Sequence, residues 1–156
     1  MEGRAQERPV LQIASVSEFI FIFIVQSSYM DKIITRTAEI SLYEKNIVWE
    51  DFKQGIQIDA DDIRENIAAS LKLTEGRKHS AVLDARGRGL TITNKAMSLG
   101  ASAEVTKDRF ATAHLTNSVA RNIIGNFFIK FFKPRIQNRM FSDEKEAIGW
   151  LRSVSK

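Results

Sequence analysis

The chain has 156 residues, a length that suits one domain with a core of its own. It is 44% hydrophobic and 27% charged, which is typical of a globular rather than a disordered protein. It has no cysteine and two histidines, His79 and His114, which excludes disulfides, thiolate nucleophiles and cysteine-based zinc sites; we expect no metal and no cofactor.

The net charge of +4 is spread unevenly along the sequence. No acid occurs between Asp108 and Asp143, a segment that carries six cations: Arg109, Arg121, Lys130, Lys133, Arg135 and Arg139. Such a segment can attract phosphate or an anionic lipid surface, but a solvated basic face is common and is the simpler interpretation. It has no helix-turn-helix pattern and no aromatic strand of RNA-binding type, so we expect no nucleic acid partner.

Residues 1–29 are expected to form an extension outside the domain. Their apolar run FIFIFIV (Phe19–Val25) is far shorter than the roughly 20 residues of a membrane-spanning helix. No small-residue cleavage site of a signal peptide follows it, although an extra β-strand is an alternative interpretation. The segment MDKIITRTAEISLY, which begins at Met30, is typical of the start of a domain. We therefore predict one domain over residues 30–156, and we expect a cytoplasmic location.

The first half of that domain predicts strands followed by a helix. Thr35–Tyr43 alternates polar and apolar residues, Ile47–Phe52 follows a turn, and Gly55–Ile58 is a candidate third strand. Asp59 is placed to cap a helix that ends near Gly76.

The second half alternates strands and helices. The predicted elements are strand Ser80–Ala85, helix Asn94–Val105, strand Phe110–Thr116, helix Ser118–Phe132, strand Asn138–Phe141 and a final helix capped by Ser142. This order predicts an α/β fold with a mixed, largely parallel sheet and about four helices packed against it.

Two loops follow predicted strands, at the edge where open α/β sheets bind ligands. The candidate anion- or partner-binding residues on them are Arg86, Arg88, Asn117, Ser118 and Arg121. These loops lack the spacing of a Walker loop or a dinucleotide site. Asp84 and His114 belong to no recognisable acid–base or nucleophile pattern, so we expect no enzyme.

The segment SVARNIIGNFFIKFFKP (Ser118–Pro134) is both apolar and basic. On a helix, most of its apolar residues share one broad face that a sheet would bury. Ile129 and Phe132 lie off that face, beside Lys130 and Lys133. These four residues are the candidate docking or ligand edge, with peripheral membrane contact as a weaker alternative.

The C-terminal text resembles small bacterial proteins of the STAS/SpoIIAA-like family. The resemblance is carried by SVARNIIGNFFIKFFKP, by RMFSDEKEAIGWL and by VLDARG (Val82–Gly87), and it covers roughly residues 33–152. The matching positions are Ser118, Arg121, Ile124, Gly125, Asn126, Phe127, Phe128, Lys133, Pro134, Phe141, Glu144, Glu146, Ala147, Trp150 and Leu151. The resemblance implies a STAS-type fold without catalytic activity.

Better-known relatives in that family are anti-sigma factor antagonists, which bind a partner kinase and are switched by phosphorylation of a serine. In this chain the corresponding region reads RGLTITNKA, which offers only Thr91 and Thr93. A phosphate on Thr93 would lie near Arg86 and Arg88, although a helix-capping hydroxyl is the simpler interpretation.

We therefore arrive at two hypotheses. The first is a non-enzymatic regulatory or protein-interaction domain of STAS type, with a kinase or anti-sigma-type regulator as its protein partner. The alternative is a carrier of a small apolar ligand or lipid, with the Phe-rich helix as a wall or lid of the pocket. Neither the partner nor the oligomeric state follows from the sequence.

Overall fold

The computed structural model describes residues 32–117 and 133–155. By its internal contacts the chain divides into two units, Met1–Met30 and Asp31–Lys156, and everything below concerns the described part of the second. The predicted N-terminal extension and the Phe-rich helix lie outside the described residues.

A six-stranded mixed sheet forms the centre of this unit, with the strand order β1-β2-β3-β5-β7-β8. The strands are β1 (Lys32–Ile34), β2 (Ala38–Glu44), β3 (Ile47–Phe52), β5 (His79–Asp84), β7 (Arg109–Leu115) and β8 (Gln137–Phe141). The first three pair antiparallel, and β3, β5, β7 and β8 run parallel to one another. The predicted α/β class with a largely parallel sheet is confirmed.

Two short elements differ from the prediction. The alternating run Thr35–Tyr43 is not one strand, because Thr35 and Ala38 close a turn in which each backbone N–H has an oxygen acceptor on the other residue. This turn folds β1 back along β2. The third predicted strand is shortened to β4 (Gln57–Ile58), which leaves the main sheet and pairs with β6 (Thr91–Ile92).

Four described helices cover the sheet: α2 (Ala60–Leu73), α3 (Asn94–Gly100), α4 (Ala103–Thr106) and α6 (Glu144–Val154). Asp59 caps α2 as predicted, in a capping box with Asp62. The single helix expected over Asn94–Val105 is instead broken after Gly100 into α3 and α4. The predicted cap Ser142 is wrong, because Asp143 accepts the backbone hydrogen bond that begins α6.

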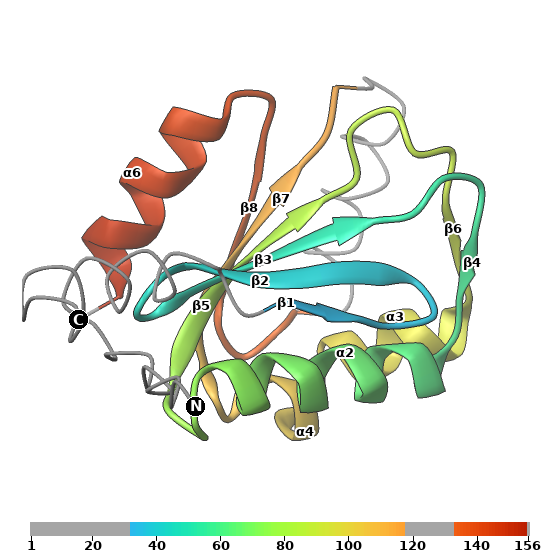
Figure 1. Ribbon diagram of the computed structural model, residues 1–156, viewed down its shortest axis with the longest axis horizontal. Coiled ribbons are helices and arrows are strands. Elements are labelled where there is room, and N and C mark those ends of the chain that lie inside the picture. The colour runs from blue at the N-terminus through green and yellow to red at the C-terminus, as the bar shows by residue number, and fades with distance from the viewer. Residues whose placement is uncertain (1–31, 118–132, 156) are drawn as a thin grey trace, which may run out of the picture. The chain divides into compact units, whose positions relative to one another are not determined.

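The helices divide between the two faces of the sheet, with α6 on one side and α2, α3 and α4 on the other (Figure 1). On the α6 face, Ile148 and Leu151 pack with Val82, Leu115 and other residues into a buried core. On the opposite face, Ile40 and Val48 pack with Leu73 and their neighbours into a second core. Alternating strand residues supply the two cores, because successive side chains point to opposite faces.

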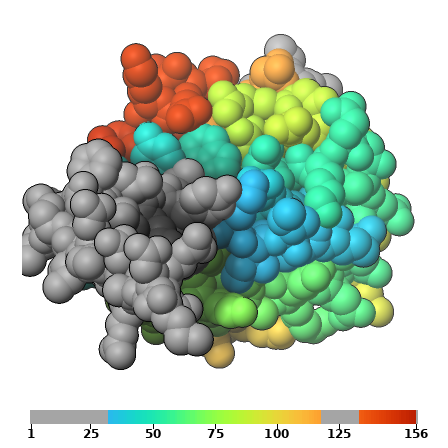
Figure 2. Space-filling view, viewed as in Figure 1, coloured from blue at the N-terminus to red at the C-terminus, as the bar shows by residue number. Residues whose placement is uncertain are grey.

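Strand β1 forms one edge of the sheet, and β1 and β2 appear in blue on the surface of the molecule (Figure 2). Ile34 on this edge is 64% exposed, beside the ion pair between Lys32 and Glu39. Charged side chains on an edge strand discourage pairing with other chains. Among the described helices, none combines the length and the apolar character needed to cross a bilayer.

Candidate functional site

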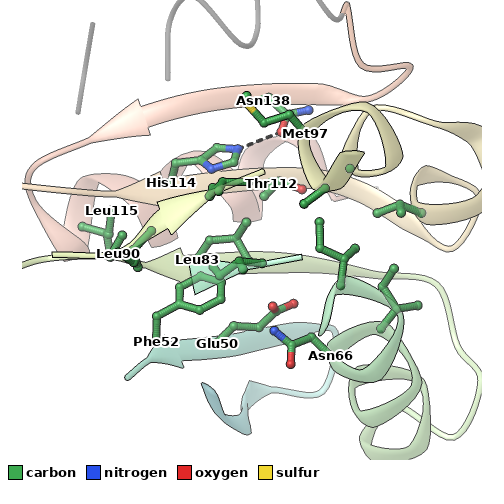
Figure 3. A pocket seen from close by; sticks show the side chains of 18 of the residues that line it. Glu50, Phe52, Asn66, Leu83, Leu90, Met97, Thr112, His114, Leu115 and Asn138 are labelled. Carbon is green, nitrogen blue, oxygen red and sulfur yellow. Dashed lines mark hydrogen bonds between the residues drawn. The ribbon is translucent and has the colours of Figure 1, made fainter. Parts of the chain in front are cut away.

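A cavity of about 420 Å³ lies between the sheet and the helices α2, α3 and α4. It is bounded by side chains of β3, β5, β7 and β8 on the sheet side, and β4 and β6 also contribute residues. Figure 3 shows it in close view, with Phe52, Glu50 and Asn66 at one end and His114 and Asn138 at the other. Its volume falls within the roughly 300–1,000 Å³ that is usual for small-molecule sites.

Apolar side chains supply most of the described lining. Representative residues are Phe52, Ile63, Leu83, Leu90, Met97 and Val105. The position of Phe52 follows from the sequence pattern, since strand alternation directs this residue of β3 to the face that α2 covers. A concave, mostly apolar surface with a few polar groups is the usual form of a binding site for a small ligand.

An ion pair between Glu50 and Arg109 supplies the only charged side chains among the described lining residues. Both are buried, with 2% and 6% of their surface exposed. Glu50 lies between Val48 and Phe52 on β3, so the strand alternation directs it inward with them. The Ser70 hydroxyl of α2 lies 3.5 Å from the same Glu50 oxygen that Arg109 contacts.

At the other end of the cavity, His114 Nε2 lies 2.9 Å from the side-chain oxygen of Asn138 (Figure 3). The Asn138 amide in turn donates to the carbonyl of Ile136 at 3.0 Å. Burial lowers the pKa of His114, so its imidazole is neutral at pH 7.

The loop after β5 is held by its own ion pairs. Asp84 accepts hydrogen bonds from the backbone and side chain of Arg86, at 2.6–3.1 Å. Burial raises the pKa of Asp84, but the hydrogen bonds from Arg86 outweigh burial and leave that pKa below its usual value. Arg88 pairs with Asp51 at 2.6 Å. Both guanidinium groups therefore already have carboxylate partners.

The structure brings Asn117 to the same loop, where its side-chain oxygen accepts a hydrogen bond from the Gly87 amide at 3.1 Å. Three of the five predicted loop residues thus lie together, while Ser118 and Arg121 fall outside the described residues. Of the predicted docking edge, Ile129, Lys130 and Phe132 also fall outside them, and Lys133 is exposed.

The two threonines have different settings. Thr93 caps α3, accepting from the Ala96 amide at 3.2 Å and donating to Asp59 at 2.9 Å. The interpretation of Thr93 as a helix cap is thus confirmed. Thr91 is exposed on β6. Phosphorylation of either residue stays a prediction.

A family model, described as a domain of unknown function (DUF7793), matches residues 41–155, which include every described element from β3 to α6. The chain belongs to the DUF7793 family. No curated protein matches the chain.

Among solved structures, the chain is similar to a crystal structure of an uncharacterized DUF3478-family protein with a SpoIIAA-like fold from Shewanella loihica PV-4. The two share 12% identity with a TM-score of 0.48, over 78% of this chain and 91% of that one.

Sequence reasoning offered an apolar pocket as an alternative, but it missed the position of the cavity, its lining residues and its ion pair. Glu50 and Arg109 are 59 positions apart along the chain, and only the sheet brings them together. A signal for one partner was present, because Glu50 is an acid at an inward position of an alternating strand, where burial requires a partner. Within the described residues, no group of three or more His, Asp or Glu could hold a metal ion.

Proposed function

We propose that this DUF7793 domain is a non-catalytic carrier or sensor that binds a small, mostly apolar molecule in the cavity between the sheet and α2–α4. The observation that carries the proposal is the cavity itself, about 420 Å³ with a largely apolar lining. Side chains that face an empty space lose the dispersion contacts of a packed core. A bound apolar ligand would restore those contacts and would also remove its own surface from water.

The asymmetry between the two faces of the sheet supports this proposal. On the α6 face, Leu115, Leu151 and Ala147 are fully buried in a packed core. Both cores have partly buried apolar residues at their margins, but on the second face three of these, Ile63, Leu83 and Leu90, line the cavity. The second face thus combines a core with a space that protein atoms of the described chain leave open.

Native mass spectrometry of the protein purified from cells without denaturation tests this function. We expect a retained small molecule, which is released when the protein unfolds. An Ile67→Trp variant fills the cavity from α2 and should carry none, because Ile67 is one of its lining residues. Ala68→Trp is the matched control, since Ala68 is the next residue of α2 and is exposed. Equal retention by both variants would contradict the proposal.

A second candidate function is protein interaction, which we propose for the loop residues 86–93. It is supported by Ile92, a large apolar side chain that is 45% exposed between Thr91 and Thr93. Affinity purification with phosphosite mapping tests it, with Ile92→Asp as the disrupting variant and Ile34→Asp on β1, an exposed isoleucine distant in sequence, as the control. Recovery of the same partner with both variants would contradict this function. Recovery of no partner with either the wild type or the control would contradict it as well.

A further inference from the structure

The charged groups of the cavity restrict the kind of ligand that it can hold. Glu50 and Arg109 line the cavity, are almost fully buried and form an ion pair with each other. Their charges cancel, and His114, the third ionisable lining residue, is held neutral by burial. The described lining is therefore mostly apolar and carries no net charge.

The ion pair does not use all of its hydrogen-bonding capacity. A guanidinium group has five N–H donors, and among the described side chains Arg109 donates only through Nη2, to Glu50 Oε1. The only other described donor to Glu50 is Ser70, at 3.5 Å and to the same Oε1 oxygen. A polar group in the cavity can therefore form two kinds of hydrogen bond with the pair. It can accept from the remaining N–H groups of Arg109, and it can donate to Glu50 Oε2.

A ligand whose polar end group (its head) is anionic would fit this site poorly. A carboxylate placed beside Arg109 would also lie near the Glu50 carboxylate, and the site would then hold one negative charge without a partner. Charges removed from water are strongly disfavoured unless they are paired. A head that is uncharged and can both donate and accept hydrogen bonds meets neither difficulty.

We infer that the cavity selects a ligand with an apolar body and an uncharged donor–acceptor head, such as a primary amide or an alcohol, over the corresponding carboxylate. The amide or hydroxyl oxygen accepts from Arg109, and its N–H or O–H donates to Glu50. This inference rests on the proposed ligand-binding function and names the ligand class of the same cavity.

Octanamide and octanoate are suitable probes, because they share an alkyl chain and differ in the charge of the head at pH 8, where a carboxylate is ionised. Displacement of the uncharged dye Nile red measures the affinity of each. For the wild-type protein we expect octanamide to bind about tenfold or more tightly than octanoate. A tighter or equal affinity for octanoate overturns the inference but leaves the ligand-binding function standing. If neither probe nor Nile red binds, the proposed function fails and the inference fails with it.

A variant tests the source of this selectivity. Glu50→Gln leaves Arg109 without its anionic partner, so octanoate should gain affinity relative to octanamide and the order should reverse. Glu39→Gln is the matched control, since Glu39 lies on the neighbouring strand β2 with its side chain 46% exposed and pairs with Lys32 outside the cavity. It should leave the wild-type order unchanged. Unchanged selectivity in a folded Glu50→Gln protein would overturn the role of the ion pair. If that variant does not fold, the wild-type comparison alone decides the inference.

Discussion

His79, the first residue of β5, is 1% exposed, with its Nδ1 3.1 Å from the carbonyl oxygen of Arg77. Its Nε2 has no hydrogen-bond partner among the described residues. Burial, together with the nearby Arg109 cation, lowers the pKa of His79 to about 4. The folded protein therefore keeps this imidazole neutral over a pH range in which the unfolded chain protonates it.

The free energy of unfolding should therefore decrease as the pH falls. An unfolded His takes up a proton near its ordinary pKa of about 6.5, so the stabilisation is complete above that pH and is lost as the pH falls toward 4. Between pH 7 and pH 5 the free energy of unfolding should fall by about 2 kcal/mol through His79 alone. Urea unfolding of wild type and His79→Gln at both pH values measures this, and the variant should lose correspondingly less. Equal losses in the two proteins would contradict the assignment, and equal slopes above pH 7 serve as the internal control.

Substitutions in the Glu50–Arg109 ion pair should change the free energy of unfolding whether or not a ligand is bound. Glu50→Gln or Arg109→Met alone leaves one buried charge without its partner, and removal of one partner of a buried pair costs about 3–5 kcal/mol. The double variant Glu50→Gln/Arg109→Met leaves no charge and should be destabilised by less than the sum of the two single changes. A double-mutant cycle by urea unfolding gives the coupling. Additive single effects would show that the pair does not act as a unit.

The role of a single residue is easier to predict from the sequence when its partners are close to it along the chain. Capping by Asp59 and Thr93 was predicted, because a cap depends on backbone groups within three residues along the chain. The pairing of Arg88 with Asp51, by contrast, joins residues 37 positions apart. Arg88 appeared as a candidate anion-binding cation in the sequence, and only the tertiary structure supplies its carboxylate.

At the level of elements, the start of α2 and the start of α3 meet through one hydrogen bond. The Thr93 hydroxyl caps α3 and also donates to Asp59, the cap of α2. Parallel pairing of β4 with β6 places these two helix starts side by side, since β4 directly precedes Asp59 and β6 directly precedes Thr93. One small two-stranded sheet therefore sets the positions of two helices that bound the cavity.

Thr93→Ala removes both hydrogen bonds and should lower the free energy of unfolding by about 1 kcal/mol, the typical cost of a lost cap. Thr93→Ser keeps a hydroxyl and should retain most of that stability. Thr91→Ala is the control, because an exposed substitution away from a cap usually changes stability by less than about 0.5 kcal/mol. Equal stability of the three variants in urea unfolding would contradict the capping role. A phosphate on Thr93 would replace the donated proton with negative charge beside Asp59, so we expect modification there to separate the two helix starts.

Long helices and strands were predicted more accurately than short ones, and elements that depend on distant residues were predicted least accurately. The strands β3, β5 and β7 were predicted to within one residue at each end, since each is a continuous apolar or alternating run of at least six residues. The pairing of β4 with β6 was not predictable, because each contributes only two residues and their partners lie in distant sequence. The break between α3 and α4 had a local signal in Gly100, whose low helix propensity favours an interruption there.

Across the domain, the two faces of one sheet have different roles. The face under α6 is a packed core, which supports the sheet, and the face under α2, α3 and α4 encloses the cavity (Figure 1). The class of fold followed from the order of strands and helices. The cavity did not, because an apolar residue has the same pattern whether it packs against a neighbour or lines an open space.

A ligand that enters the cavity must stabilise the whole domain, since the cavity exists only when sheet and helices are assembled. Octanamide at about 100 times its dissociation constant should raise the free energy of unfolding by about 2.7 kcal/mol, the value expected for one site that is absent in the unfolded chain. Urea unfolding with and without octanamide measures the increase, and the slope with urea should stay unchanged. Ile67→Trp should abolish the increase, whereas Ala68→Trp on the exposed side of α2 should preserve it. An increase that survives in Ile67→Trp would place the binding site elsewhere on the molecule, because that variant leaves every surface outside the cavity unchanged.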